Sequence, residues 1–126
     1  MIYKIINKSK DKVISQTAFI ARSFFSRLLG LMFRKSIAED EALVFYHAPS
    51  IHTFFMRFPI DIVFLDKNMR VMKIYPALKP WKLAICLHSL LTLEFPPHKV
   101  SQATTKVGDI LELILNETYS VHQENP

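Results

Sequence analysis

Eight short runs rich in Ile, Val, Phe, Tyr and Thr occupy much of this chain and limit what it can fold into. The runs lie at residues 2–6, 12–21, 42–48, 60–66, 70–75, 82–87, 91–95 and 109–115. Short runs of β-branched and aromatic residues favour strands over helices, because such side chains pack well on a pleated surface. The sequence therefore predicts a protein built mostly of short strands.

Two of these runs also indicate where their strands lie in a sheet. In residues 60–65 both faces are apolar except for Asp61, which predicts a strand covered on both sides. In the run 109–115 leucines share one face and Glu112 charges the other, which predicts an edge or half-exposed strand. The segment Asp66–Met69 joins two runs and predicts a hairpin turn.

One main helix is predicted over residues 23–30. Ser23 can cap its first turn, apolar side chains then recur along one face, and Gly30 comes where the helix should end. A second, short helix is predicted near residues 100–105. About eight strands with one main helix predict a small α+β, mainly β domain, either a barrel or a strongly curled sheet, because closure leaves few open edges.

The composition bounds the domain count and excludes several kinds of site. The chain has 126 residues, of which 50% are hydrophobic, so we expect a single packed domain over 1–126 with a frayed tail at 122–126. Its two glycines, Gly30 and Gly108, cannot form a dinucleotide fingerprint or a P-loop. Cys86 is the sole cysteine, which excludes an intramolecular disulfide and a zinc site that needs several thiolates.

The net charge of +5 is spread along the chain. Its densest group, Lys8, Lys10 and Lys12, alternates with polar residues and favours a solvated surface strand over a nucleic-acid patch. Residues 1–12 contain no apolar core of a secretion signal, and the apolar runs are too short to span a bilayer. We therefore expect a soluble cytoplasmic protein, and no residue pattern predicts a cofactor.

Three stretches of the chain resemble a known family. They are "SRLLGLMFRKSI", "SIHTFFMRFPIDIVFLDKNMRV" and "LTLEFPPHKVSQATTKVGDIL". They resemble the bacterial and archaeal family called domain of unknown function 192, an uncharacterised ancient conserved region, and the likeness covers about residues 13–115. The matching motifs are Arg27 with Gly30–Met32, Phe55–Arg57, Pro59–Asp61, Phe64–Asp66, Leu93–Glu94 and Val107–Asp109. The resemblance implies a small β-rich domain and implies no reaction.

This chain departs from its relatives at three places. Similar sequences commonly carry Gly at the position of Met69, so we expect Asn68 to take the strained position of that turn. After Leu93-Glu94 they commonly read Pro-Ala-Gly, whereas this chain reads Pro96–His98, which alters the bend. Some relatives carry Cys at the position of Ala48 that could pair with one at the position of Cys86, so Cys86 is expected to be a free thiol here.

Arg57 and Asp61 are four residues apart, but Pro59 between them excludes an ordinary helix interior. A turn at Phe58-Pro59 would bring the guanidinium to the carboxylate, whose geometry it matches. The pair could fix the bend, or Arg57 could hold an anionic ligand that Asp61 orients. A carboxylate in so apolar a strand has to be bonded, so we expect Asp61 to accept backbone N–H groups or Arg57.

His52 is expected at the margin of a groove, hydrogen-bonded or acting as a general base or ligand contact. With His47, His88 and His98 it lacks the paired spacing of a zinc-binding helix, so no metal site is predicted. The apolar neighbours of Cys86 favour an inert buried thiol, and a Cys86–His52 dyad would require the two to meet in space.

Six aromatic residues fall within one stretch and could form either core or a shared groove: Phe54, Phe55, Phe58, Phe64, Tyr75 and Trp81. Trp81 follows Pro80, which places it on a bend, and we expect it to be the exposed member. We expect four apolar side chains of the stretch 50–66 to be mostly buried: Phe55, Ile60, Ile62 and Phe64.

These observations lead to one main hypothesis and two others. The main one is a non-enzymatic accessory domain that binds an unknown small molecule, a peptide or a protein in an aromatic-lined groove near His52, Arg57, Asp61 and Trp81. The alternative is a small hydrolase or transferase that uses His52 with Asp61 or Cys86. Nucleic-acid binding is the third and least favoured, and it would weaken steeply with salt.

Overall fold

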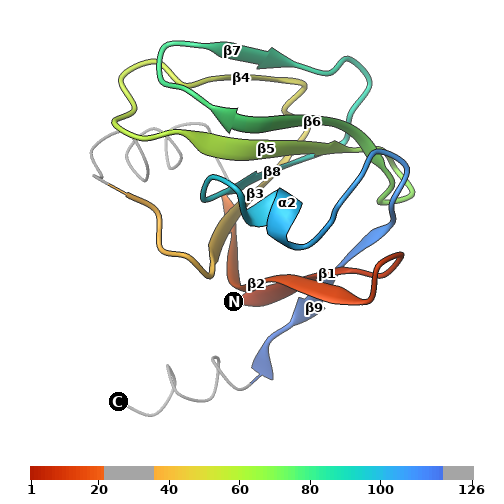
Figure 1. Cartoon of the computed structure of the whole chain (residues 1–126). Coiled ribbons are helices and arrows are strands. Elements are labelled where there is room, and N and C mark those ends of the chain that lie inside the picture. Colours follow the sequence, from red (N-terminus) through yellow and green to blue (C-terminus); the bar gives the residue numbers. More distant parts are fainter. Residues whose placement is uncertain (22–35, 118–126) are drawn as a thin grey trace.

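The computed structural model describes residues 1–21 and 36–117 (Figure 1). The described residues form nine strands and a short helix, here called α2. Their bounds are β1 Tyr3–Asn7, β2 Lys12–Ala21, β3 Glu41–Tyr46, β4 Ser50–His52, β5 Ile60–Leu65, β6 Val71–Leu78, β7 Leu83–Ile85, β8 Leu91–Phe95, α2 Lys99–Gln102 and β9 Leu111–Leu115.

Seven of the strands form one curled sheet in the order β6-β5-β8-β3-β2-β1-β9. Its neighbouring strands pair antiparallel except β2 and β3, which pair in parallel. The two edges of the sheet meet at one bridge between Arg70 and Ile110, so the sheet curls into a half-barrel. Strands β4 and β7 form a separate two-stranded sheet at one end of the molecule, at the top of Figure 1.

Strand β5 divides two apolar cores, and every one of its residues is buried. Val63 and Leu65 pack into a first core with residues of β1, β2, β8, β9 and α2, whereas Ile62 and Phe64 pack into a second core. Alternate side chains of a strand point to opposite faces, which is why neighbours in β5 serve different cores. Ile51 of β4 and Ala84 of β7 belong to the second core, so the small sheet covers it.

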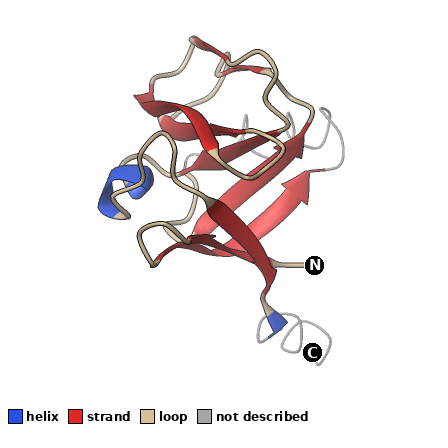
Figure 2. Cartoon of the chain, turned by 90° about the vertical axis from the view of Figure 1, so that its right-hand side faces the viewer, coloured by secondary structure: helices blue, strands red, loops and turns tan. Residues whose placement is uncertain are grey.

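Most of the fold expected from the sequence is confirmed. Each of the eight runs contains a strand, β5 is covered on both faces, and β9 is an edge strand. The short helix is present as α2, which lies at the side of the curled sheet (Figure 2). Strand β4 was missed. The helix expected at 23–30 and the tail at 122–126 lie outside the described residues.

The hairpin turn between β5 and β6 is confirmed, but its strained position is not the expected one. The Asp66 carboxylate accepts the backbone N–H groups of Asn68 and Arg70, and Met69 N–H donates to the Asp66 carbonyl. Met69 has φ of 62°, so Met69 itself takes the left-handed position, and the expectation for Asn68 was wrong. The side chain of Met69 packs against the first core, which offsets part of the strain.

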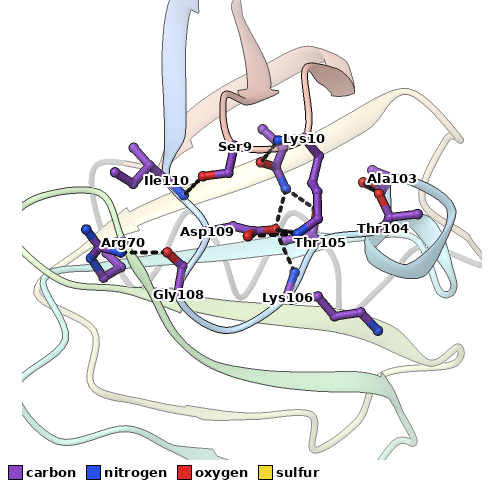
Figure 3. A network of polar contacts seen from close by, with 11 residues as sticks. Ser9, Lys10, Arg70, Ala103, Thr104, Thr105, Lys106, Gly108, Asp109 and Ile110 are labelled. Atoms are coloured by element: carbon purple, nitrogen blue, oxygen red, sulfur yellow. Dashed lines mark hydrogen bonds and ion pairs between the residues drawn. The ribbon is translucent and has the colours of Figure 1, made fainter.

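Asp109 ties the β1–β2 turn to the start of β9 (Figure 3). Its carboxylate accepts bonds from Asn7 Nδ2, from the backbone N–H of Lys106 and from Lys10 Nζ. Burial alone would raise the pKa of this carboxyl, but these hydrogen bonds and the Lys10 charge outweigh it and lower the pKa to about 2. Lys8, Lys10 and Lys12 are all exposed, as expected, but only Lys12 lies in a strand, because Lys8 and Lys10 belong to the turn before β2 and Lys10 bonds Asp109.

Candidate functional site

The small β4–β7 sheet carries His52, one of the four expected site residues. His52 pairs across the strands with Leu83, and Ser50 pairs with Ile85. Ile51 and Ala84 point inward to the second core, so the alternate positions face solvent. The sheet lies beyond β5 and β6, at the end of the molecule opposite to β1 and β9 in both views (Figures 1 and 2).

Thr53, which is fully buried, holds together the two turns that flank this sheet. Its carbonyl accepts the backbone N–H groups of Met56 and of Trp81. Its hydroxyl donates to the Lys79 carbonyl at 2.7 Å and accepts the Lys82 N–H at 2.9 Å. The hydroxyl therefore occupies the place where a turn usually closes with its own hydrogen bond. One buried side chain thus fixes both turns relative to each other.

Both turns place a bulky aromatic residue where glycine is usually found. In the turn Thr53–Met56 the third residue is Phe55, with φ of 67°. In the turn Lys79–Lys82 the second residue is Pro80 and the third is Trp81, with φ of 65°. A proline at the second position and a positive φ at the third are marks of a type II turn, which favours glycine at that third position. A large side chain there is strained, and such strain concentrates at functional sites.

The turns assemble four rings into a row that we call the aromatic surface: His52, Phe54, Trp81 and Phe55. His52 stacks on Phe54 with ring centroids 5.0 Å apart, and Phe54 stacks on Trp81 at 5.7 Å. Phe55 meets Trp81 edge to face at 4.5 Å. Phe54, Phe55 and Trp81 are nevertheless 39%, 59% and 58% exposed. The rings pack mainly on one another and leave large faces open to solvent.

These exposures confirm one expectation and correct another. Trp81 is exposed, as its place after Pro80 predicted. Phe55 was expected to be buried and is not, because the turn at Thr53–Met56 directs it outward, away from the second core. Ile60, Ile62 and Phe64 are fully buried as expected.

Cationic residues adjoin the aromatic residues in the sequence. Arg57, Lys79 and Lys82 are exposed, and within residues 1–21 and 36–117 no carboxylate forms an ion pair with them. Between residues 47 and 89 the only acidic residues are Asp61, which is buried, and Asp66, which lies in the β5–β6 turn. This side of the molecule therefore presents positive charge beside apolar rings.

Asp61 is confirmed as a bonded carboxylate inside the fold. It is 1% exposed, and its oxygens accept the backbone N–H groups of Ala77, His98 and Val100 at 2.7, 3.1 and 2.9 Å. Asp61 was expected to bond either backbone N–H groups or Arg57. It bonds backbone N–H groups, and the described residues show no bond between Asp61 and the exposed Arg57. Asp61 thus serves the bend around α2, and Arg57 stays at the surface.

Cys86 and His52 are not brought together by the strand register. Cys86 N–H donates to the Pro49 carbonyl, three residues before His52, which corresponds to about 10 Å along a strand. Cys86 is a free thiol, as expected, and burial raises its pKa, which disfavours the reactive thiolate.

The four described histidines and the described carboxylates form no group that could hold a metal ion.

Two buried polar residues near the second core were missed by sequence reasoning. Thr53 is one, and Glu94 of β8 is the other, fully buried on the strand face opposite to Leu93. Glu94 is the only charged residue in the run Leu91–Phe95, and that charge was the available signal for it. For Thr53 no signal existed, because its partners at Lys79 and Lys82 are far away in the sequence.

A cavity of about 480 Å³ lies elsewhere, between β9 and the β5–β6 turn. Its walls include Tyr46, Met69, Leu91 and Ile110–Leu113. None of the four expected site residues lines it.

No helix in the described part of the chain is long and apolar enough to cross a membrane.

Comparison with known proteins identifies a family and several relatives of this chain. The model of the family described as "Uncharacterized ACR", domain of unknown function 192, matches residues 5–113. A UPF0127 protein of Pyrococcus horikoshii is 44% identical over 64% of this chain and 72% of its own length. A second, from Pyrococcus furiosus, is 32% identical over 86% of this chain and 96% of its own length.

Two solved structures share the fold. One is a protein of unknown function from Novosphingobium aromaticivorans, with a TM-score of 0.74, 24% identity, and coverage of 89% of this chain and 84% of that one. The other is a putative transcription regulator from Sinorhizobium meliloti, with a TM-score of 0.74, 20% identity, and coverage of 88% and 91%. At these identities the likeness concerns the fold alone.

Proposed function

The chain belongs to the domain of unknown function 192 family, and we propose that it is a non-catalytic binding domain whose working part is the aromatic surface. The surface docks the chain onto a partner, in keeping with an accessory role. His52 and Trp81 are members of this surface, and Arg57 lies beside it. Asp61 is not part of this surface. It supports the surface indirectly, because it accepts the Ala77 N–H near the end of β6, which leads to the Trp81 turn.

One observation carries the proposal. Phe55 and Trp81 adopt a backbone conformation that favours glycine, and both expose more than half of their surface. Rings placed for stability would be buried and relaxed, because burying apolar area is what stabilises a fold. Strained and exposed rings contribute little to the fold, and exposed aromatic patches with an arginine at the rim are typical of binding sites.

The catalytic alternative receives no comparable support from the described residues. A nucleophile and its base have to come within about 3 Å or share one water. Cys86 lies about 10 Å along the strand from His52, and the Asp61 oxygens already accept three backbone N–H groups. We therefore propose binding without chemistry.

The experiment uses Trp81 as its own reporter. The chain has one tryptophan, so its fluorescence comes from Trp81 alone. The protein is titrated with pooled metabolites, with a displayed random peptide library and with lipid vesicles, and Trp81 emission and melting temperature are followed. We expect at least one class of probe to shift the emission to shorter wavelength and to raise the melting temperature.

A matched pair of variants locates the binding. Phe55→Ala removes an exposed ring of the aromatic surface, and Val107→Ala removes an exposed apolar side chain elsewhere. Binding that weakens in Phe55→Ala and persists in Val107→Ala supports the proposal. Absence of binding to every class of probe, or equal loss in both variants, refutes it.

A further inference from the structure

Exposed apolar side chains continue from the aromatic surface along β7 and beyond it. Leu83 and Ile85 of β7 are exposed, and so is Leu87 in the following turn. Leu83 lies directly across from His52, so the aliphatic side chains adjoin the row of rings. Together they make an apolar face over the two turns and the outer side of the small sheet. A continuous apolar face of this kind marks a docking surface.

The shape of this face separates two kinds of partner. Phe54, Phe55 and Trp81 lie in two neighbouring turns at the end of the molecule, not in the walls of the described cavity. Phe55 and Trp81 occupy the third positions of these turns and are more than half exposed, so their rings extend outward from the fold. Rings that extend outward can enter a deformable layer such as a membrane surface, whereas a small ligand needs a concave site.

The charges around the face point to an anionic layer. Lys79 and Lys82 flank Trp81, Arg57 follows the Phe54-Phe55 turn, and Lys73 Nζ reaches the Ile85 carbonyl at 3.1 Å. Lysine is depleted in protein–protein interfaces, but each lysine beside an anionic lipid surface adds to affinity. Exposed lysines around exposed rings therefore favour a lipid surface over a protein groove.

We propose that the apolar face docks the chain onto the surface of an anionic membrane, which specifies the partner and rests on the proposed function. Phe54, Phe55 and Trp81 enter the interfacial layer, where aromatic rings are favoured. Lys79, Lys82 and Arg57 meet the lipid phosphates. The attachment is peripheral and combines two weak signals, apolar insertion and charge, as reversible membrane binding requires. A cytoplasmic protein would meet the anionic inner leaflet.

The test measures co-sedimentation of the full chain with two kinds of vesicle. One contains equal parts of phosphatidylglycerol and phosphatidylcholine, and the other contains phosphatidylcholine alone. We expect binding and a blue shift of Trp81 emission with the anionic vesicles, weaker binding with the neutral ones, and weakening as salt screens the charges. Equal binding to both vesicles would overturn the anionic part of the proposal.

Variants with equal net charge show whether the face or the overall charge is responsible. Lys79→Gln with Lys82→Gln removes two charges from the face, and Lys67→Gln with Lys106→Gln removes two exposed charges outside it. Because each surface cation contributes a factor of about five, the first pair weakens vesicle binding about 25-fold and the second changes it little. If the two double variants weakened vesicle binding equally, the vesicles would be responding to the net charge of the protein and not to a defined face. That result would refute the inference.

The outcome also separates this inference from the proposed function. If displayed peptides bind in a manner that needs Phe55 and anionic vesicles do not bind, the membrane is the wrong partner and the binding domain stands. If no metabolite, peptide or vesicle binds, both proposals are wrong. Vesicle binding that is lost in Phe55→Ala and retained in Val107→Ala supports both.

Discussion

Asp61 Oδ1 accepts the backbone N–H of His98 at 3.1 Å, although the two residues are 37 positions apart. His98 precedes α2 with φ of 72°, and its own side chain does not cap the helix. The Asp61 carboxylate accepts the N–H of Val100 in the first turn of α2, so a side chain of β5 caps the helix. It also bonds the N–H of Ala77, which has φ of 43°. One carboxylate thus holds two strained backbone positions.

Asp61→Ala is expected to lower the free energy of unfolding by about 2–4 kcal/mol, because it leaves three N–H groups without their acceptor. Chemical denaturation followed by circular dichroism measures the change. Asp40→Ala is the control: its exposed carboxylate forms one long ion pair with Lys99, so the loss should stay under about 1 kcal/mol. Similar losses in the two variants would contradict the capping role of Asp61.

His98→Gly is expected to stabilise the protein by about 0.5–1 kcal/mol, because glycine reaches the left-handed conformation without steric strain. The exposed His98 side chain has little packing to lose. Gln102→Gly, at an exposed position inside α2, is the control and should cost about 1 kcal/mol. A loss of stability in His98→Gly would show that the histidine side chain does more than the backbone geometry indicates.

How far the sequence predicted the fold depends on the range of the interactions. The strands were predictable because runs such as Ile60–Leu65 carry their β-forming residues locally. Strand β4 was missed because it spans three residues, two of them polar. The partners of Asp61 could not be predicted, since Arg57 lies nearby in the sequence but Ala77 and His98 come together only in the folded sheet.

Asp109 gives the protein a defined response to acid. Its pKa is lowered from 3.8 to about 2 in the folded state, so the unfolded state binds the proton first as the pH falls. The stabilisation is therefore complete above about pH 4 and is lost as the pH falls from 4 toward 2, by on the order of 2 kcal/mol. Comparing the free energies of unfolding of the parent and Asp109→Asn across this range measures it.

The Asp109→Asn difference should be largest near neutral pH and shrink as the pH falls from 4 toward 2, since the unfolded parent then binds a proton that the folded carboxylate does not yet bind. Asp11→Asn, at an exposed turn position, is the control and should show no such trend. A difference that stays constant down to pH 2 would contradict the lowered pKa.

Thr53→Val is expected to destabilise the protein by about 1–3 kcal/mol, because a buried hydroxyl that bridges two backbone groups is replaced by a methyl group. It should also loosen the Lys79–Lys82 turn, which acrylamide quenching of Trp81 fluorescence would register as faster quenching. Thr53→Ser keeps the hydroxyl and should keep the quenching rate of the parent. Unchanged quenching in Thr53→Val would show that the turn does not depend on the bridge.

The candidate site was only partly predictable, for a physical reason. Pro80 placed Trp81 on a bend, and the exposure of Trp81 followed from that. Phe55 sits among apolar residues, which favours burial, and its outward direction comes from a bond between the Thr53 carbonyl and Met56 N–H that composition does not encode. The meeting of the two turns depends on tertiary bonds through Thr53.

The central claim is that the rings of the aromatic surface are kept for binding and not for folding, and the free energy of unfolding of the double variant Phe55→Gly with Trp81→Gly tests it most directly. Glycine relieves the strain at both turns, which offsets the lost ring contacts, so we predict a decrease of no more than about 1 kcal/mol. A decrease of more than about 3 kcal/mol, as expected when buried aromatic residues are truncated, would show that the rings support the fold and would contradict the claim.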